Sequence, residues 1–181
     1  MARPMTEALI DSHDAALFDL DGVVYLGSEV VPAAPATMSR LRANGVGVGF
    51  VTNNAARATT VVADQLTDMG IPAAPSDVVS SAEAVTALVA TKLGQGARVL
   101  IAATSNVDDL ARKRGLVPVH SADEHPQAVI QGYDPDIEWS RLEEAAFAVQ
   151  AGARWYASNP DMTRPTDRGL VPVSYTHLTL P

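Results

Sequence analysis

The chain has 181 residues, of which 47% are hydrophobic and 19% charged, a composition typical of a globular protein with one domain or two small ones. It contains no cysteine, which excludes disulfides, thiolate metal sites and a cysteine nucleophile. The formal net charge of −8 argues against nucleic acid as a partner, because polyanion binding depends on clustered lysine and arginine. No segment resembles a signal peptide or a membrane helix, so we expect a cytoplasmic protein with no membrane partner.

The first 80 residues alternate strand and helix patterns. Residues 15–20 and 46–52 are short apolar runs that end in polar residues, as buried parallel strands do. Residues 32–45 have a helical spacing of apolar residues and end in Asn44-Gly45, a C-terminal cap signal. Residues 59–70 repeat that pattern and end at Gly70. Alternating strands and helices predict an α/β fold with a parallel sheet.

The alternation continues through the rest of the chain. Strands are predicted at 77–80, 98–103, 116–119, 127–131 and within 153–161, with helices at 82–93, 107–114 and 137–152. The bulky aromatic residues Trp139, Phe147 and Trp155 are predicted to lie in the core, although Trp139 is also a candidate for lining a substrate pocket. No linker, low-complexity segment or repeat separates these elements.

Polar residues follow the first two predicted strands. Asp19 and Asp21 end the first strand, and Thr52, Asn53 and Asn54 end the second. In open α/β sheets ligands bind at the carboxyl ends of the strands, so neighbouring strands would bring these residues into one crevice. Two carboxylates with a hydroxyl and backbone N–H groups suit phosphoryl transfer assisted by Mg²⁺.

The spacing of the two acids fits that chemistry. Residues i and i+2 of an extended chain point to the same side, so Asp19 and Asp21 can address one substrate. Asp19 is expected to be the ionised nucleophile and a metal ligand, and Asp21 to move the proton. Gly22 allows the sharp turn that follows.

Simpler interpretations exist for each motif taken alone. Asp-x-Asp-Gly is also typical of a surface turn, and Thr-Asn-Asn of a strand exit. The chain has no P-loop, nucleophile-elbow or zincin motif. His120 and His125 lie in a polar loop, where metal binding is the less favoured interpretation.

Four strings in order resemble the haloacid dehalogenase superfamily, and within it the IIA branch of phosphatases. FDLDGVVYLG (18–27) resembles the first family motif and FVTNNAAR (50–57) the second, while QAVIQGYDP (127–135) and YASNPDMTRPTDRGLVP (156–172) resemble cap-region strings. The resemblance implies a Rossmann-like parallel core with an inserted α/β cap.

The resemblance also implies roles for the strand-end residues. Asp19 would form an aspartyl-phosphate, and Asp21 would be the general acid/base whose backbone carbonyl also holds Mg²⁺, which makes Asp19 and Asp21 the metal residues. Thr52 would bind the phosphate, with Asn53 beside it and Asn54 as a further substrate-binding candidate. The implied substrate is a small phosphomonoester.

The implied domain organisation is 1–80 for the N-terminal part of the core, 81–170 for the cap and 171–181 for a return to the core. Cap residues that are candidates for closure or substrate contact, with turn chemistry as the open alternative, are Tyr133, Asp134, Asn159 and Asp161. Related caps often meet in homodimers, so a homodimer through the cap is implied for a full-length parent.

Two family parts are absent from the sequence: the lysine in Gly-Lys-Pro and the second acidic motif. Lys92 and Lys113 lie in predicted cap helices without the Gly-Lys-Pro context. Residues 174–181 resemble a translated adapter, so we expect a C-terminally truncated phosphatase with a non-native tail and little or no activity of its own. The alternatives are a non-catalytic protein that binds a phosphorylated ligand or a partner, and a phosphotransferase or phosphomutase.

Overall fold

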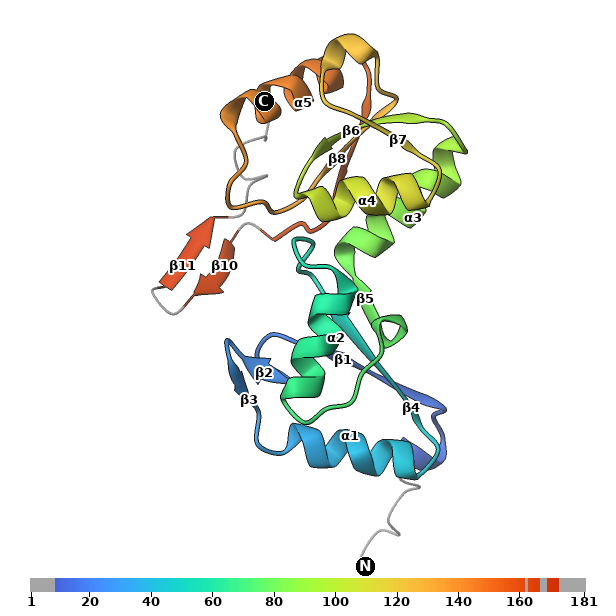
Figure 1. The fold of residues 1–181 in the computed structure, drawn as a ribbon, viewed down its shortest axis with the longest axis vertical. Helices are drawn as coiled ribbons and strands as arrows, with labels where there is room; N and C mark the ends of the chain where they lie inside the picture. Colours follow the sequence, from blue (N-terminus) through green and yellow to red (C-terminus); the bar gives the residue numbers. More distant parts are fainter. Residues whose placement is uncertain (1–8, 162, 167–168, 173–181) are drawn as a thin grey trace, which may run out of the picture. The chain divides into compact units, whose positions relative to one another are not determined.

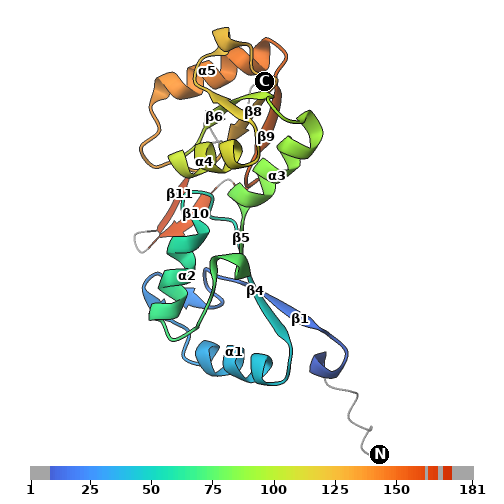
Figure 2. The ribbon, with the colours of Figure 1, turned by 45° about the vertical axis from the view of Figure 1, so that its right-hand side comes forward.

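The computed structural model describes residues 9–161, 163–166 and 169–172, so the tail predicted at 174–181 lies outside the described residues. The chain divides into two compact units. The first comprises the chain up to Thr52 together with Thr59–Val79, and the second comprises Asn53–Ala58 and the chain from Ser80 onward. Figure 1 labels the α-helices and most strands of both units, and Figure 2 also labels β9.

The first unit holds a three-stranded sheet with the order β1-β4-β5. Strands β1 and β4 run parallel, as the sequence predicts, and Asp19 lies beside Val51. The two short strands β2 and β3 pair as an antiparallel hairpin that no sequence pattern predicts. The elements in chain order are η1 (Leu9–Asp11), β1 (Ala15–Asp19), β2 (Tyr25–Leu26), β3 (Glu29–Val30), α1 (Ala34–Ala43), β4 (Gly47–Thr52), α2 (Thr59–Asp68), η2 (Pro75–Asp77) and β5 (Val78–Ser80).

One face of this sheet is packed and the other is open. Val48 and Phe50 of β4 are buried against apolar residues of α1 and α2, among them Met38 and Leu66. Alternate residues of a strand point to opposite faces. On the opposite face, Leu17 remains 73% exposed, and Val51 and Val79 are also exposed. Apolar surface of this kind favours association with other molecules.

Replacing Leu17 with asparagine is expected to reduce self-association of the chain at high concentration and to leave the free energy of unfolding within about 0.5 kcal/mol. Leu26→Asn is the matched control, because Leu26 is 72% exposed and belongs to the hairpin rather than to the β1-β4-β5 sheet. Sedimentation velocity measures the effect. If the Leu17→Asn variant and the unaltered chain associate equally, this face of the sheet is not the surface through which the chain self-associates.

The second unit is built on a four-stranded sheet with the order β7-β6-β8-β9, in which neighbouring strands are all parallel. Figure 2 shows the helices beside it. An antiparallel hairpin, β10-β11, follows. The elements are α3 (Ser81–Leu93), β6 (Arg98–Ala102), α4 (Ser105–Lys113), β7 (Val117–Val119), η3 (Ala122–Glu124), β8 (Ala128–Gln131), α5 (Trp139–Gln150), β9 (Arg154–Ala157), β10 (Thr163–Thr166) and β11 (Gly169–Pro172).

Helices cover both faces of the second sheet. Apolar residues of α3 and α4 pack with one set of strand residues, which includes Ile101 and Ile130. Ala145 and Ala148 of α5 pack with the alternate set, which includes Leu100. Parallel sheets are typically covered on both faces in this way. The predicted α/β class with parallel sheets is confirmed.

The prediction that the large aromatic residues lie in the core is wrong. Trp139 is 65% and Phe147 56% exposed, and Trp155 is exposed as well. Helix α5 buries Leu142, Ala145 and Ala148 instead. Small alanine side chains allow a helix to approach the sheet closely, so the bulky aromatic residues of α5 are placed on its outer side.

Among the described residues, no helix combines the length and apolar character needed to cross a membrane.

Candidate active site

The two acids lie where β1 ends. Asp19 is the last residue of β1, and both Asp19 and Asp21 are exposed, whereas Leu20 between them is fully buried. This alternation is what an extended backbone produces. The Asp19 carboxylate accepts a hydrogen bond from the backbone N–H of Leu20, with 2.8 Å between Oδ1 and N, which fixes the orientation of the carboxylate.

A tight turn follows Asp21. Gly22 has a φ of +83°, a conformation that costs glycine little and other residues more. Its N–H donates to the carbonyl oxygen of Tyr25 at 2.7 Å, and the N–H of Tyr25 donates to the carbonyl oxygen of Leu20 at 3.2 Å. These bonds hold Asp21 in a backbone bridge with Tyr25. The turn that the sequence predicts at Gly22 is therefore present.

Thr52 ends the neighbouring strand at the same edge of the sheet. Because Asp19 lies beside Val51, Thr52 is one residue farther along β4. Thr52 is 3% exposed, on the packed face that Val48 and Phe50 share. The structure thus brings Asp19, Asp21 and Thr52 to one sheet edge, where parallel strands present their carboxyl ends.

Asn53 and Asn54 belong to the second unit, whereas Asp19 belongs to the first. The structure therefore does not test whether these residues share a site. The carbonyl oxygen of Asn53 accepts a hydrogen bond from Ser81 Oγ at 2.8 Å, and Asn53 Nδ2 donates to Asp161 Oδ2 at 3.4 Å. Asn54 Oδ1 accepts the N–H of Ala56 at 3.0 Å, which makes an Asx turn.

Two cap candidates take part in turn chemistry. Asp134 Oδ1 accepts the N–H of Asp136 at 3.0 Å, and Asn159 Oδ1 accepts the N–H of Asp161 at 2.9 Å. These are Asx turns, in which the side chain stabilises its own loop. The side chain of Asp161 also makes a long-range contact, with Asn53. No local sequence signal predicts it, because the two residues are 108 positions apart.

The two acids at the end of β1, Asp19 and Asp21, offer the type of ligand atom that suits a magnesium ion. Carboxylate oxygens are the ligands that Mg²⁺ prefers, in near-octahedral geometry. Within the described ranges, no group of three or more histidine, aspartate or glutamate side chains is arranged to hold a metal ion. Asp19 and Asp21 are therefore candidates for part of a magnesium shell, and His120 and His125 belong to no such group among the described residues.

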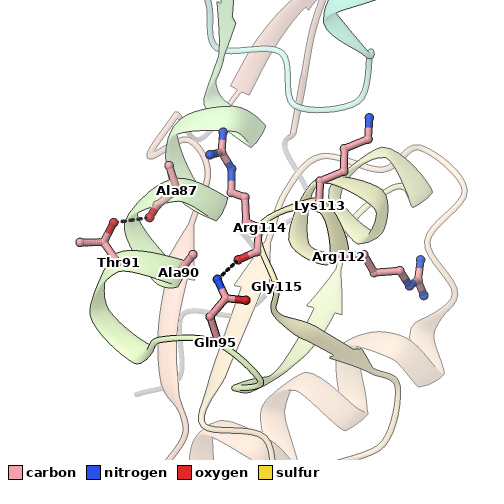
Figure 3. Close-up of a pocket in the computed structure, with 8 residues that line it drawn as sticks. All are labelled: Ala87, Ala90, Thr91, Gln95, Arg112, Lys113, Arg114 and Gly115. Atoms are coloured by element: carbon pink, nitrogen blue, oxygen red, sulfur yellow. Dashed lines mark hydrogen bonds between the residues drawn. The ribbon is translucent and has the colours of Figure 1, made fainter.

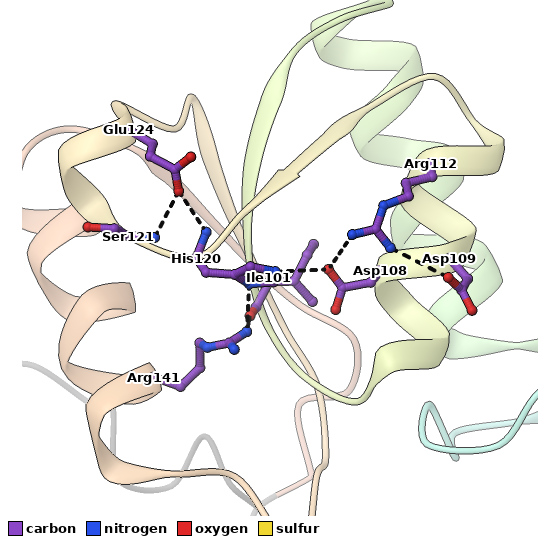
Figure 4. A network of polar contacts seen from close by, with 8 residues as sticks. All are labelled: Ile101, Asp108, Asp109, Arg112, His120, Ser121, Glu124 and Arg141. Atoms are coloured by element: carbon purple, nitrogen blue, oxygen red, sulfur yellow. Dashed lines mark hydrogen bonds and ion pairs between the residues drawn. The ribbon is translucent and has the colours of Figure 1, made fainter.

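A polar network ties α4, β6, α5 and the loop after β7 of the second unit together, as Figure 4 shows. Arg141 Nη1 donates to the carbonyl oxygen of Ile101 and to His120 Nδ1, both at 2.9 Å. Arginine has no acceptor, so His120 Nδ1 accepts this hydrogen bond. His120 Nε2 lies 3.9 Å from Asp108 Oδ1, and Arg112 Nη2 lies 3.8 Å from the same oxygen.

Burial raises the pKa of the Asp108 carboxyl above its ordinary value, and it outweighs the opposing effect of His120, Arg112 and Arg141. Ionised Asp108 therefore costs the folded state free energy. This penalty is absent below the unfolded-state pKa and is fully present above the folded-state pKa, so stability falls as pH rises through that window.

Asp108→Asn is expected to raise the thermal midpoint at neutral pH, and the gain should shrink as the pH falls through the raised pKa of the folded state toward the ordinary aspartate pKa, below which it should vanish. Asp109→Asn is the control, because Asp109 lies beside it on α4 and is exposed. Thermal melts of both variants across pH measure the difference. A lower midpoint for Asp108→Asn at neutral pH would mean that the cation contacts outweigh burial.

An open hollow of about 550 Å³ lies between α3 and α4, lined in part by Gln95, Arg112, Lys113 and Arg114 (Figure 3). Arg114 already pairs with Glu83 at 2.5 Å, and Arg112 pairs with two aspartates of its own helix. Gln95 Nε2 donates to the carbonyl oxygen of Arg114 at 3.1 Å. Since two of the three cations are neutralised, the hollow lacks the charge of an anion site.

The chain belongs to the haloacid dehalogenase-like hydrolase family, whose model matches residues 16–117. This confirms the family predicted from the motifs.

Relatives in the family are phosphatases. The chain is 42% identical to D-glycerol 3-phosphate phosphatase of Mycobacterium tuberculosis over 166 residues, which is 92% of this chain and 46% of the relative. It is 34% identical to acid sugar phosphatase of Staphylococcus aureus over 160 residues, 88% of this chain and 61% of the relative. The chain therefore spans about half to three fifths of the length of these relatives.

Solved structures agree in fold. A glycerol phosphate phosphatase from Mycobacterium tuberculosis in complex with magnesium matches with a TM-score of 0.88 and 40% identity, over 94% of this chain and 51% of that one. A 4-nitrophenylphosphatase from Thermotoga maritima matches with a TM-score of 0.85 at 24% identity, over 94% and 64%, and shows the fold alone.

Proposed function

We propose that the chain is part of a Mg²⁺-dependent phosphatase that hydrolyses a small phosphomonoester through an aspartyl-phosphate on Asp19. The observation that carries the proposal is the meeting of Asp19, Asp21 and Thr52 at the carboxyl edge of one parallel pair of strands. The phosphatase relatives support the reaction class.

The residues divide the reaction between them. Asp19, held by the N–H of Leu20, attacks phosphorus, and the bond from phosphorus to the ester oxygen breaks. Asp21 gives a proton to the leaving oxygen and then takes one from the water that attacks the phosphoryl group. Thr52 donates its hydroxyl to a phosphoryl oxygen, and the Asn53-Asn54 segment contributes further donors.

Magnesium would be held by Asp19 and Asp21. When bound, it supplies positive charge that offsets the charge of the phosphoryl oxygens. The relative from Mycobacterium tuberculosis that was solved with magnesium supports this choice of ion.

The domain roles follow from the same proposal. Residues 1–80, most of which form the first unit, would be the N-terminal part of the catalytic core, and residues 81–170 would be the cap that selects the substrate. Identity to a glycerol 3-phosphate phosphatase and an acid sugar phosphatase supports a small polyol or sugar phosphate as substrate. The exposed Trp139 and Phe147 of α5 support a homodimer formed through the cap.

The chain alone is proposed to be inactive or nearly so. Two carboxylates are too few for firm Mg²⁺ binding, and neither Lys92 nor Lys113 stands in a Gly-Lys-Pro context. A retained phosphate-binding site without catalysis is the second candidate, and this incomplete set of residues is the feature that favours it. In a phosphotransferase or phosphomutase, the phosphoryl group on Asp19 would pass to a second substrate instead of water, and the earlier steps would be the same.

The test compares this chain with an extended chain, in which residues 1–172 are followed by the remainder of the Mycobacterium tuberculosis relative. We expect the extended chain to hydrolyse an aryl phosphate only with Mg²⁺, and this chain to show little or no hydrolysis. An extended chain that folds, binds phosphate and fails to hydrolyse the ester would favour the binding protein. Phosphoryl transfer to an added alcohol in preference to water would favour a transferase.

A further inference from the structure

The strand order of the second unit creates a place where a ligand would be expected. From β6 the chain passes to β7 on one side and then returns to β8 on the other side. In open α/β sheets such a switch point leaves a crevice at the carboxyl ends of the two strands, where ligands bind. Here those ends are Ala102 of β6 and Gln131 of β8.

The crevice is filled by the chain itself. Ala55, from the segment 53–58, is 1% exposed and belongs to the apolar cluster that includes Ala103 and Ile130. Gly132, the residue after β8, makes room for it, because a Cβ atom at Gly132 would lie 3.4 Å from Ala55 Cβ and 3.3 Å from Ala103 Cβ. The segment that directly follows Thr52 in sequence thus packs as part of the second unit.

Asn106 bonds to the backbone of this segment. It is the second residue of α4, and its Nδ2 donates to the carbonyl oxygens of Ala55 at 3.2 Å and Arg57 at 3.4 Å. The hydroxyl of Ser81, the first residue of α3, donates a hydrogen bond to the carbonyl oxygen of Asn53. Both contacts are to main-chain carbonyls, so they fix the path of the backbone whatever its side chains are.

We propose that Asn106 is a positioning residue that orients Asn53 and Asn54 by holding the backbone of residues 55–57 in the switch-point crevice of the second sheet. The role in phosphate binding rests on the proposed function of Asn53 and Asn54. The segment 53–58 of this chain then occupies the crevice in place of a free ligand.

Limited trypsin digestion of this chain tests the positioning role, because the bond after Arg57 lies inside the held segment. Asn106→Ala removes the donor, and Asn106→Asp keeps the size of the side chain but replaces the donor by an acceptor. Loss of two hydrogen bonds from the segment is expected to speed cleavage after Arg57 about fivefold or more. Cleavage after Arg141 and Arg154 should not change, and Asp109→Asn on the same helix should behave like the unaltered chain.

Two results would overturn the proposal: an unchanged rate after Arg57 in both Asn106 variants, or an equal increase at all three sites in both. The second result would mean that Asn106 only stabilises the whole unit. If the alanine variant alone speeds cleavage at all three sites, it destabilises the whole unit. In that case the aspartate variant is the test: faster cleavage after Arg57 alone supports the positioning role, and an unchanged rate after Arg57 rejects it.

A titration with Mg²⁺ and inorganic phosphate, followed by amide NMR, separates this inference from the proposed function. We expect the amides of Asn53 and Asn54 to shift in the unaltered chain and to shift less in Asn106→Ala. No shift in the unaltered chain, together with selective cleavage after Arg57 in the variants, would reject the phosphate role of this segment and leave its positioning by Asn106 intact.

Discussion

Replacing Asp19 with asparagine is expected to lower aryl phosphate hydrolysis by the extended chain by on the order of 10⁴-fold, with the fold unchanged. An amide oxygen is a far weaker nucleophile than a carboxylate, so the covalent step is lost. The substitution keeps the size of the side chain, and an amide oxygen can still accept the hydrogen bond that Leu20 N–H now donates to the carboxylate.

Asp14→Asn is the matched control. Asp14 is exposed and precedes the amino end of β1, so the same chemical change occurs beside the same strand but at its opposite end. Initial rates at saturating Mg²⁺ measure both variants, and circular dichroism checks that both are folded. An Asp19→Asn variant that retains a tenth or more of the activity would rule out Asp19 as the nucleophile.

Phe50→Ala is expected to cost about 3–5 kcal/mol of the free energy of unfolding of the first unit. Phe50 is fully buried in the middle of β4, the central strand of its sheet. A loss of this size is a large share of the about 5–15 kcal/mol that stabilises a typical domain. Because Thr52 lies two residues farther along β4, its position should be lost with the strand.

Val51→Ala is the control for this prediction. Val51 is the next residue along β4, but its side chain points to the open face and is 39% exposed. Its loss should cost less than about 1 kcal/mol. Urea denaturation followed by circular dichroism measures both values. Equal costs for the two variants would mean that the two faces of the sheet are packed alike.

Much of the fold follows from local patterns. The strands around Phe50 and Ile101 are short apolar runs, and α1 ends at a cap signal, with Gly45 at a φ of +79°. The acids at 19 and 21 are recognisable because they stand together at a strand end beside Gly22. These features depend on residues a few positions apart, which is the range over which sequence periodicity is informative.

The features that the sequence did not predict depend on distant contacts or on a choice between helix faces. Trp139 and Phe147 are apolar, but α5 packs through Ala145 and Ala148, and hydrophobicity alone does not reveal which apolar face is buried. The contact of Asn106 with Ala55 spans 51 positions, and nothing near either residue predicts it. The hairpin β2-β3 has strands of two residues, too short for an alternating pattern.

Trapping of the phosphorylated protein is the direct test of Asp19 as the nucleophile. In an extended chain carrying Asp21→Asn, the aryl leaving group departs without a proton, but attack by water lacks its base, so the phosphorylated enzyme should accumulate. The measurement is mass spectrometry of peptides after a rapid acid quench. We expect one phosphoryl group on the peptide that contains Asp19, and its loss in the Asp19→Asn, Asp21→Asn double variant. A phosphoryl group on another residue, or phosphate release at the unaltered rate with no phosphorylated peptide, would contradict it.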